Sequence, residues 1–152
     1  MSKGYLWYTV VLLHIVHVFT QTDVVDVCDV DRLTLSNERQ TGTIVFNGPY
    51  TAVQNPCVLR LQALPSSFIF IRPSNMFNFI WCSQRSMPPL CPPGCSYAYV
   101  FDGFYYNETL TRIVDNRWKG FNTSSSVLYV AVCHSSTTHV KMVLNYTTIG
   151  KL

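Results

Sequence analysis

The sequence predicts an all-β protein, an antiparallel β-sandwich whose two sheets are held by disulfide bonds. Three observations support this prediction. Short runs of alternating apolar and polar residues recur about every ten to fifteen residues between turn residues, which is typical of half-buried strands. No segment of about a dozen residues has the 3.6-residue apolar spacing of an amphipathic helix. All six cysteines follow residue 27, and an even cysteine count in a small chain indicates a disulfide framework.

The composition indicates one folded domain. A chain of 152 residues falls within the usual domain size of about 100–200 residues. Hydrophobic residues make up 48% of the chain and charged residues 12%, unlike a disordered protein. The formal net charge of +3 includes Lys3 and is spread along the chain. Domains that bind nucleic acid carry clustered basic faces, so we expect no nucleic-acid partner.

The N-terminus has the layout of a secretory signal peptide. Lys3 precedes an apolar run from Tyr5 to Phe19, after which the chain turns polar at Thr20 and acidic from Asp23. The apolar run is shorter than the roughly 20 residues that span a bilayer. An uncleaved anchor is the alternative, because two histidines interrupt the run and it has no A-x-A cleavage site.

We therefore expect residues 1–22 to be removed by a cut near residues 20–22. Residues 23–152 then remain as a single domain that is secreted to the extracellular space. No later segment has about 18 consecutive apolar residues, so we expect no membrane span after cleavage.

The first half of the domain predicts three strands. Cys57–Gln62 alternates, and a turn follows at 65–67. The run 68–71 is apolar on both faces, which favours a strand that is covered on both sides and is ended by Pro73. A further alternating run, 77–82, places aromatic residues on one face. We expect these aromatic side chains in the core rather than on a surface that stacks a ligand.

The second half predicts a proline-rich loop and three more strands. The prolines of 88–95 exclude a central strand or helix interior. Tyr97, Tyr99 and Phe101 alternate in the next run, which ends at an Asp-Gly turn signal. The run 127–133 is nearly all apolar, and an alternating strand over 140–146 closes the domain.

The cysteines are expected to be bridged. Zinc binding is the alternative, but the spacings match no common zinc module and an oxidising compartment favours disulfides. Six cysteines allow about fifteen pairings, and the spacing alone does not select one. The residues concerned are Cys28, Cys57, Cys82, Cys91, Cys95 and Cys133.

Three N-x-[ST] sequons lie beyond residue 100 and agree with secretion. Asn145 shares a strand face with Lys141, so its side chain is expected to point to solvent. The predicted glycosylation sites are Asn107, Asn122 and Asn145.

The order of these segments resembles a CUB domain, the extracellular sandwich of complement, developmental and sperm-coating proteins. The resemblance covers about residues 28–147 and is nearer to divergent invertebrate CUB-like proteins. It implies a jelly-roll sandwich that acts in recognition. The segments that carry it are Cys28, Thr41-Gly42-Thr43-Ile44, Pro49-Tyr50, Asn55-Pro56-Cys57, the run from Cys95 to Gly103, Ser124-Ser125-Ser126 with the strand after it, and the final strand 140–146.

The chain departs from the family at the place where many CUB domains bind calcium through carboxylates. The corresponding neighbourhoods contain Trp81 and Cys82, Ala98, and His134 with two serines. Calcium needs several oxygen ligands, usually carboxylates, so we expect no metal site and no cofactor.

The same neighbourhoods contribute the extra cysteines of this chain, so bridges are expected to replace the ion. The resemblance implies a Cys28–Cys57 bond. Within the cysteine-rich end it favours Cys82–Cys95, which leaves Cys91 to pair with Cys133.

Little in the sequence indicates catalysis. It contains no nucleophile elbow, zinc-protease motif or phosphate-binding loop. His134 and His139 flank a Ser-Ser-Thr-Thr segment, where we expect exposed histidines rather than metal ligands. Asp102 and Glu108 resemble a hydrolase pair only in residue type, since one lies in a turn and the other in a sequon. We therefore expect no enzyme activity, and a small hydrolase is the least favoured function.

Aromatic and basic residues are concentrated between the Asp-Gly turn and the serine-rich turn. Trp, Tyr and Arg dominate the binding energy of many interfaces, and a Trp between two cations suits a sugar or an anion. The alternative is that Trp118 and Phe121 lie at the edge of the core with the cations pointing outward. The candidate ligand-binding residues are Tyr105, Tyr106, Arg117, Trp118 and Lys119.

Together these features predict a secreted recognition or adhesion module that binds an extracellular protein or glycan. The alternative is a secreted protease inhibitor or innate-immunity effector that acts through the rigid loop 88–95, because preorganisation lowers the cost of binding.

Overall fold

The computed structural model describes most of the chain after the predicted signal peptide. The described residues are 23–36, 40–48, 56–79, 91, 93–103, 111–113 (backbone only), 118–134 and 139–150. The predicted signal peptide, Cys82, Asn107, Tyr105, Tyr106 and Arg117 lie outside these ranges. Within them, no helix is long and apolar enough to cross a membrane.

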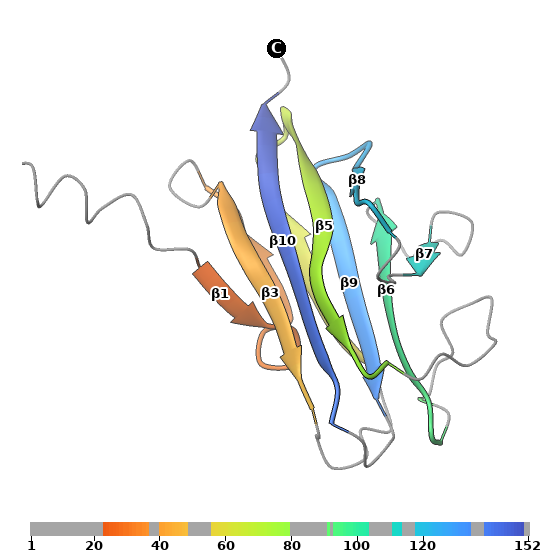
Figure 1. Cartoon of the computed structure of the whole chain (residues 1–152). Coiled ribbons are helices and arrows are strands. Elements are labelled where there is room, and N and C mark those ends of the chain that lie inside the picture. Colours follow the sequence, from red (N-terminus) through yellow and green to blue (C-terminus); the bar gives the residue numbers. More distant parts are fainter. Residues whose placement is uncertain are drawn as a thin grey trace, which may run out of the picture.

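Ten strands form two stacked five-stranded sheets in the described part of the chain (Figure 1). Sheet A has the order β1 (Asp23–Asp26), β3 (Thr41–Asn47), β10 (Lys141–Gly150), β5 (Ser67–Phe77) and β8 (Phe121–Asn122). Sheet B has the order β2 (Arg32–Thr34), β4 (Cys57–Gln62), β9 (Val127–His134), β6 (Ser96–Asp102) and β7 (Thr111–Ile113). The all-β, disulfide-bonded sandwich predicted from the sequence is confirmed. The pairs β1–β3 and β2–β4 are parallel, and the other pairs are antiparallel.

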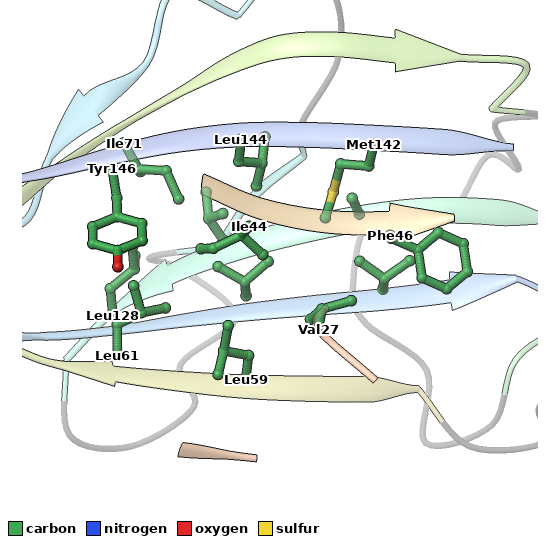
Figure 2. Close-up of a cluster of buried hydrophobic side chains, with 14 of the residues drawn as sticks. Val27, Ile44, Phe46, Leu59, Leu61, Ile71, Leu128, Met142, Leu144 and Tyr146 are labelled. Carbon is green, nitrogen blue, oxygen red and sulfur yellow. The ribbon is translucent and has the colours of Figure 1, made fainter. Parts of the chain in front are cut away.

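The core lies between the sheets and follows the alternation of the sequence (Figure 2). On β10, Met142, Leu144 and Tyr146 are at most 1% exposed. Lys141 lies on the opposite face of the same strand and is exposed to solvent. Leu59 and Leu61 meet them from β4. Each fully buried side chain of this size stabilises the fold by roughly 1.5–3 kcal/mol.

One glycine allows three strands of sheet A to pack closely. A Cβ at Gly42 of β3 would overlap the phenol ring of Tyr146 and lie 2.8 Å from the backbone oxygen of Asp23. The hydrogen on Gly42 therefore makes room for the largest buried side chain of β10. Asp23 is the first residue of β1, the edge strand that pairs with β3.

Strand β5 differs from the prediction in its length. Pro73 was expected to end a strand, but β5 continues to Phe77 through a register shift against Val143 and Leu144. Proline lacks a backbone N–H and is tolerated at a bulge, where the hydrogen-bond ladder is already interrupted. The strand ends before Asn78, which has a positive φ of 55°. Phe77 is 52% exposed, so its predicted place in the core was wrong.

The outer face of β5 also differs from the prediction. Ile69 and Ile71 are fully buried between the sheets, but Phe68 and Phe70 point to the other face and are only half-buried. Hydrogen bonding on both sides, to β10 and β8, does not provide cover for the face of a strand. The apolar run predicted burial on both faces because it cannot distinguish these two kinds of neighbour.

Strand β6 is buried on both faces. Ala98 and Val100 face the inter-sheet core, while Tyr97 and Tyr99 lie in a second buried cluster on the outer face of sheet B with Cys91, Cys95 and Cys133. Further along that face, Phe101 stacks on Tyr129 of β9 with ring centroids 4.8 Å apart. The aromatic residues of β6 are therefore buried, as expected, but on the side opposite to the main core.

Candidate functional site

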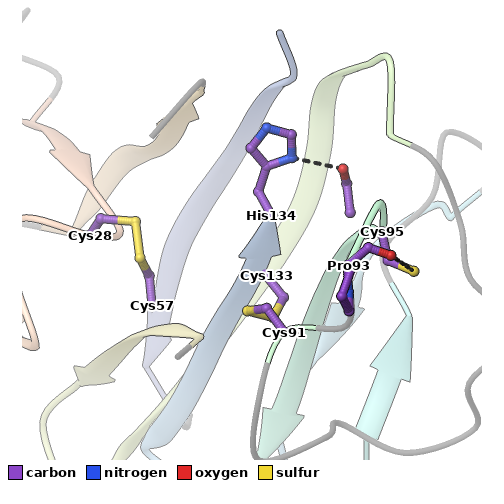
Figure 3. The surroundings of a disulfide bond; sticks show 8 residues. Cys28, Cys57, Cys91, Pro93, Cys95, Cys133 and His134 are labelled. Atoms are coloured by element: carbon purple, nitrogen blue, oxygen red, sulfur yellow. Dashed lines mark hydrogen bonds between the residues drawn. A yellow bond between two sulfur atoms is a disulfide. The ribbon is translucent and has the colours of Figure 1, made fainter. Parts of the chain in front are cut away.

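Two disulfide bonds connect cysteines that were expected from the sequence to be bridged (Figure 3). Cys28, in the turn after β1, is bonded to Cys57 at the start of β4, which ties the first strand of sheet A to sheet B. Cys91 is bonded to Cys133 with a Cα–Cα distance of 5.5 Å. Cys95 is also disulfide-bonded. The first two bonds are the pairs that the resemblance favoured, and the expected partner of Cys95, Cys82, lies outside the described residues.

A buried serine–histidine pair lies beside this cysteine-rich end. Ser96 and His134 are register partners at the ends of β6 and β9, and the Ser96 Oγ is 2.8 Å from the His134 Nδ1. The imidazole packs edge-on against Phe46 at 5.9 Å, and a Cβ at Gly48 would lie only 3.0 Å from its Cδ2. His134 is 1% exposed, so the prediction that it is exposed was wrong. His139 is exposed as expected.

The sequence contained a signal for the position of His134. Residues two apart on a strand share a face, so His134 continues the inward row of Val130 and Val132. The prediction ended that strand one residue too early and assigned the histidine to the turn. The pairing of β6 with β9 instead extends through it.

The serine–histidine pair resembles a nucleophile and its base in residue type. Ser96 is 0% exposed, however, so its hydroxyl cannot meet a substrate in this conformation. Each side chain instead provides a hydrogen-bond partner for a buried polar group, which avoids a desolvation cost of about 1–3 kcal/mol. Among the described residues, no group of three or more His, Cys, Asp or Glu side chains is placed to hold a metal ion.

The buried cluster on the outer face of sheet B contains the side chain of Tyr97. Its ring is 2% exposed and lies edge-on to Tyr99 at 5.0 Å. Among the described residues its hydroxyl has no hydrogen-bond partner. Burial raises the pKa of Tyr97 well above its ordinary value of 10, and the neighbouring Tyr99 raises it further.

Tyr97→Phe is therefore expected to stabilise the protein by about 1 kcal/mol at neutral pH, because it removes an unpaired buried hydroxyl. Because the pKa of Tyr97 is raised in the folded protein, this tyrosine ionises first in the unfolded chain as the pH rises above about 10, so stability is unaffected by its titration below that pH and falls above it. The fall in stability above pH 10 should consequently be shallower in the variant. Thermal unfolding across pH 7–11 measures both effects, with Tyr129→Phe on the same face as the control. A variant that is less stable by more than 1 kcal/mol would show that the hydroxyl has a partner.

The candidate ligand-binding residues that the structure describes lie where the chain crosses between the sheets. Trp118 and Lys119 precede β8, an edge strand of sheet A, and follow β7, an edge strand of sheet B (Figure 1). Trp118 is half-buried against the core, with its ring 5.6 Å from that of Phe121. Lys119 is exposed. This matches the core-edge alternative for the two aromatic rings, with the described cation pointing outward.

Gly120 fixes the course of this crossing, which we call the edge segment (residues 118–120). Its φ of 94° is a left-handed conformation that favours glycine. A Cβ at this position would overlap the backbone oxygen of Ile71 and lie 2.8 Å from the Cβ of Arg72. Gly120, at the end of the edge segment, therefore lies directly against β5.

A carboxylate organises the serine-rich turn before β9, and sequence reasoning missed it. Asp102, at the end of β6, accepts hydrogen bonds from the Ser124 N–H, the Ser125 N–H at 3.3 Å and the Ser125 hydroxyl at 2.9 Å. The carboxylate is 8% exposed. The Asp-Gly pair was predicted only as a turn signal, because the partners lie more than twenty residues further along the chain.

The comparisons with known proteins concern the fold. No family model matches the chain, and no curated protein matches it. Among solved structures, the chain is similar to the CUB1-EGF-CUB2 domains of rat MASP-1, with 14% identity and a TM-score of 0.55 over 79% of this chain and 40% of that one. It is also similar to the MASP-1 CUB2 domain bound to Ca²⁺, with 12% identity and a TM-score of 0.52 over 75% of this chain and 96% of that one. The CUB1-EGF-CUB2 domain of human MASP-1/3 gives 12% identity and a TM-score of 0.49 over 78% of this chain and 41% of that one.

The chain thus spans about the length of one CUB domain and less than half of the three-domain fragments. The resemblance inferred from the order of motifs is confirmed at the level of the fold, which is CUB-like. Ala98, one of the positions matched to the family's calcium neighbourhood, is fully buried in the core of this chain.

Proposed function

Because the fold is CUB-like, we propose that the protein is a secreted, non-enzymatic recognition or adhesion module that binds an extracellular protein or glycan. Residues 1–22 act as its signal peptide, and residues 23–152 form the mature domain. The disulfide bonds support this route, because such bonds persist in oxidising compartments. A fold alone does not determine function, so a binding surface must be argued from particular residues.

The observation that carries the proposal is the placement of Trp118 and Lys119 in the edge segment. The core holds one side of the Trp118 ring, which leaves the half-buried indole in a fixed position beside an exposed cation. Rigid aromatic residues next to cations provide much of the binding energy of interfaces at little entropic cost. The other candidates from the sequence, Tyr105, Tyr106 and Arg117, lie outside the described residues.

Lys119→Glu is expected to weaken partner binding at least tenfold, about 1.4 kcal/mol, without changing the fold, since the residue is exposed. The partner is first identified by a glycan array and by affinity capture with the tagged secreted domain. Binding is then titrated for the wild type and the variant. Lys141→Glu is the matched control, an exposed lysine on the far part of sheet A. Equal losses in the two variants, or none in either, would contradict the proposed surface.

Neither the fold nor the comparisons favour the alternative of an inhibitor or immune effector. Half of loop 88–95 lies outside the described residues. Its two cysteines, Cys91 and Cys95, are disulfide-bonded and lie in the buried cluster of sheet B. The bonded cysteines attach the loop to sheet B, but they do not indicate a protease or microbial surface that the loop would bind.

A further inference from the structure

The outer face of sheet A, opposite to the core, brings two of the predicted glycosylation sites together. On this face Asn145 of β10 is the register partner of Thr43 on β3 and of Arg72 on β5. Two residues further along β10, Thr147 is the register partner of Phe70. Phe70 is in turn the register partner of Asn122 on β8. Direct cross-strand partners share a sheet face, so these side chains form one continuous surface.

The two asparagines present their acceptor amides on this surface. Asn122 is exposed, while Asn145 is half-buried between two outward-facing neighbours. The Thr43 hydroxyl donates a hydrogen bond to the Asn145 Oδ1 at 3.2 Å. That bond uses the carbonyl oxygen and not the Nδ2 that carries an N-linked glycan. The sequon threonine, Thr147, lies on the same face as Asn145 because the two are separated by one residue of a strand.

Phe70 lies between the two acceptors. Asn122 and Asn145 are on strands two positions apart, which corresponds to about 10 Å across the sheet. The intervening strand contributes the half-buried ring of Phe70, and Ile69 and Ile71 on either side of it are fully buried in the core. The open side of a half-buried aromatic ring between two sugar attachment points offers an apolar surface to the C–H face of a sugar ring.

We propose that Phe70 is a shared platform for the N-linked glycans of Asn122 and Asn145, so that the outer face of sheet A is a glycan-covered face which the glycans stabilise. Attachment replaces one Nδ2 hydrogen with the anomeric carbon of an oligosaccharide. The sugar comes from a lipid-pyrophosphate donor, which leaves as the lipid pyrophosphate together with a proton. The inference depends on the secretory route of the proposed function, and it assigns that face to the protein's own glycans rather than to a partner.

The test compares the wild-type protein with glycosylation-site and Phe70 variants, each expressed from the full chain and secreted by a eukaryotic cell that attaches N-linked glycans. Glycopeptide mass spectrometry first measures occupancy at Asn122 and Asn145. The melting temperature is then measured with and without the pair Asn122→Gln and Asn145→Gln, in the wild-type and Phe70→Ser backgrounds. Removing the glycans should lower the melting temperature by about 3 °C in the wild type and by less than 1 °C in the Phe70→Ser background.

Two further backgrounds separate the platform from a general effect of losing an aromatic residue. Phe77→Ser removes an exposed phenylalanine from the same strand and should leave the glycan-dependent shift at its wild-type value. Phe70→Leu keeps apolar bulk without a ring face, and it serves if Phe70→Ser does not fold. It should reduce the shift by at least half.

The possible results distinguish this inference from the proposed function. Secreted protein with both asparagines unmodified would overturn the inference and leave secretion intact. Occupied sites with an equal shift in every Phe70 background would also overturn it. Protein that stays inside cells without glycans would overturn the proposed function, and this inference with it.

Discussion

Replacing Cys91 and Cys133 together with alanine is expected to lower the free energy of unfolding by about 4 kcal/mol. The bond joins residues that are 42 positions apart, so its loss releases a long loop in the unfolded chain and raises the entropy of that state. The two residues are 8% and 1% exposed in the cluster on the outer face of sheet B. Alanine removes the sulfurs without burying a hydroxyl there.

Guanidinium denaturation measures this effect in two ways. The midpoint should fall, and the slope of stability against denaturant should rise because an unfolded chain with one bridge fewer exposes more surface. The pair Cys28→Ala and Cys57→Ala is the matched control, with residues 29 positions apart and an expected loss of about 3.5 kcal/mol. An unchanged midpoint for the first pair would show that the Cys91–Cys133 bond does not form in the purified protein.

Asp102→Ala is expected to lower the free energy of unfolding by about 3 kcal/mol. The carboxylate accepts hydrogen bonds from the N–H groups of Ser124 and Ser125 and from the Ser125 hydroxyl. Without the carboxylate these three donors lose their acceptor, and the serine-rich turn loses the hydrogen bonds that connect it to the end of β6. The turn aligns β9, the central strand of sheet B, so its loosening should also reduce cooperativity.

Two variants make the Asp102 result specific, with thermal and denaturant unfolding as the measurement. Asp102→Asn keeps the shape and one acceptor oxygen, so it should lose about half as much stability. Asp31→Ala removes an exposed aspartate and should change stability by less than about 0.5 kcal/mol. A loss in Asp102→Ala no larger than that of Asp31→Ala would show that the turn is held by its backbone alone.

The alternation of the sequence predicted the strands whose two faces have different environments. Leu59 and Leu61 on β4, and Met142 and Leu144 on β10, are buried where the pattern placed them, because a period of two matches the pleat. The order of the cysteines and turn motifs added the CUB-like arrangement, which periodicity alone does not specify.

The prediction failed where burial depends on neighbours distant in sequence. Phe70 and Tyr97 both lie on outer faces, yet Phe70 is half-buried and Tyr97 is 2% exposed. Alternation assigns residues to one of two faces, but it does not say which face is covered. His134 was misplaced because the length of the β6–β9 ladder is determined by pairing across the sheet.

For the candidate sites, the sequence identified individual residues but not how the fold brings them together. Residue types and sequons identified Trp118, Lys119, Asn122 and Asn145 as separate features. Their arrangement comes from strand order, which places β8 and β10 on either side of β5. No local pattern connects Asn122 to Asn145, and none connects Asp102 to the serine-rich turn, because these pairs are formed only by the folded sheets.

Folding as a disulfide-bonded sandwich in the secretory pathway underlies every proposal made for this protein. The most direct test is non-reducing peptide mapping of the tagged chain recovered from the culture medium of secreting cells. We expect linked peptides for Cys28–Cys57 and Cys91–Cys133 and a new N-terminus near residues 20–22. Protein that remains inside the cells, with its cysteines open to thiol reagents, would contradict it.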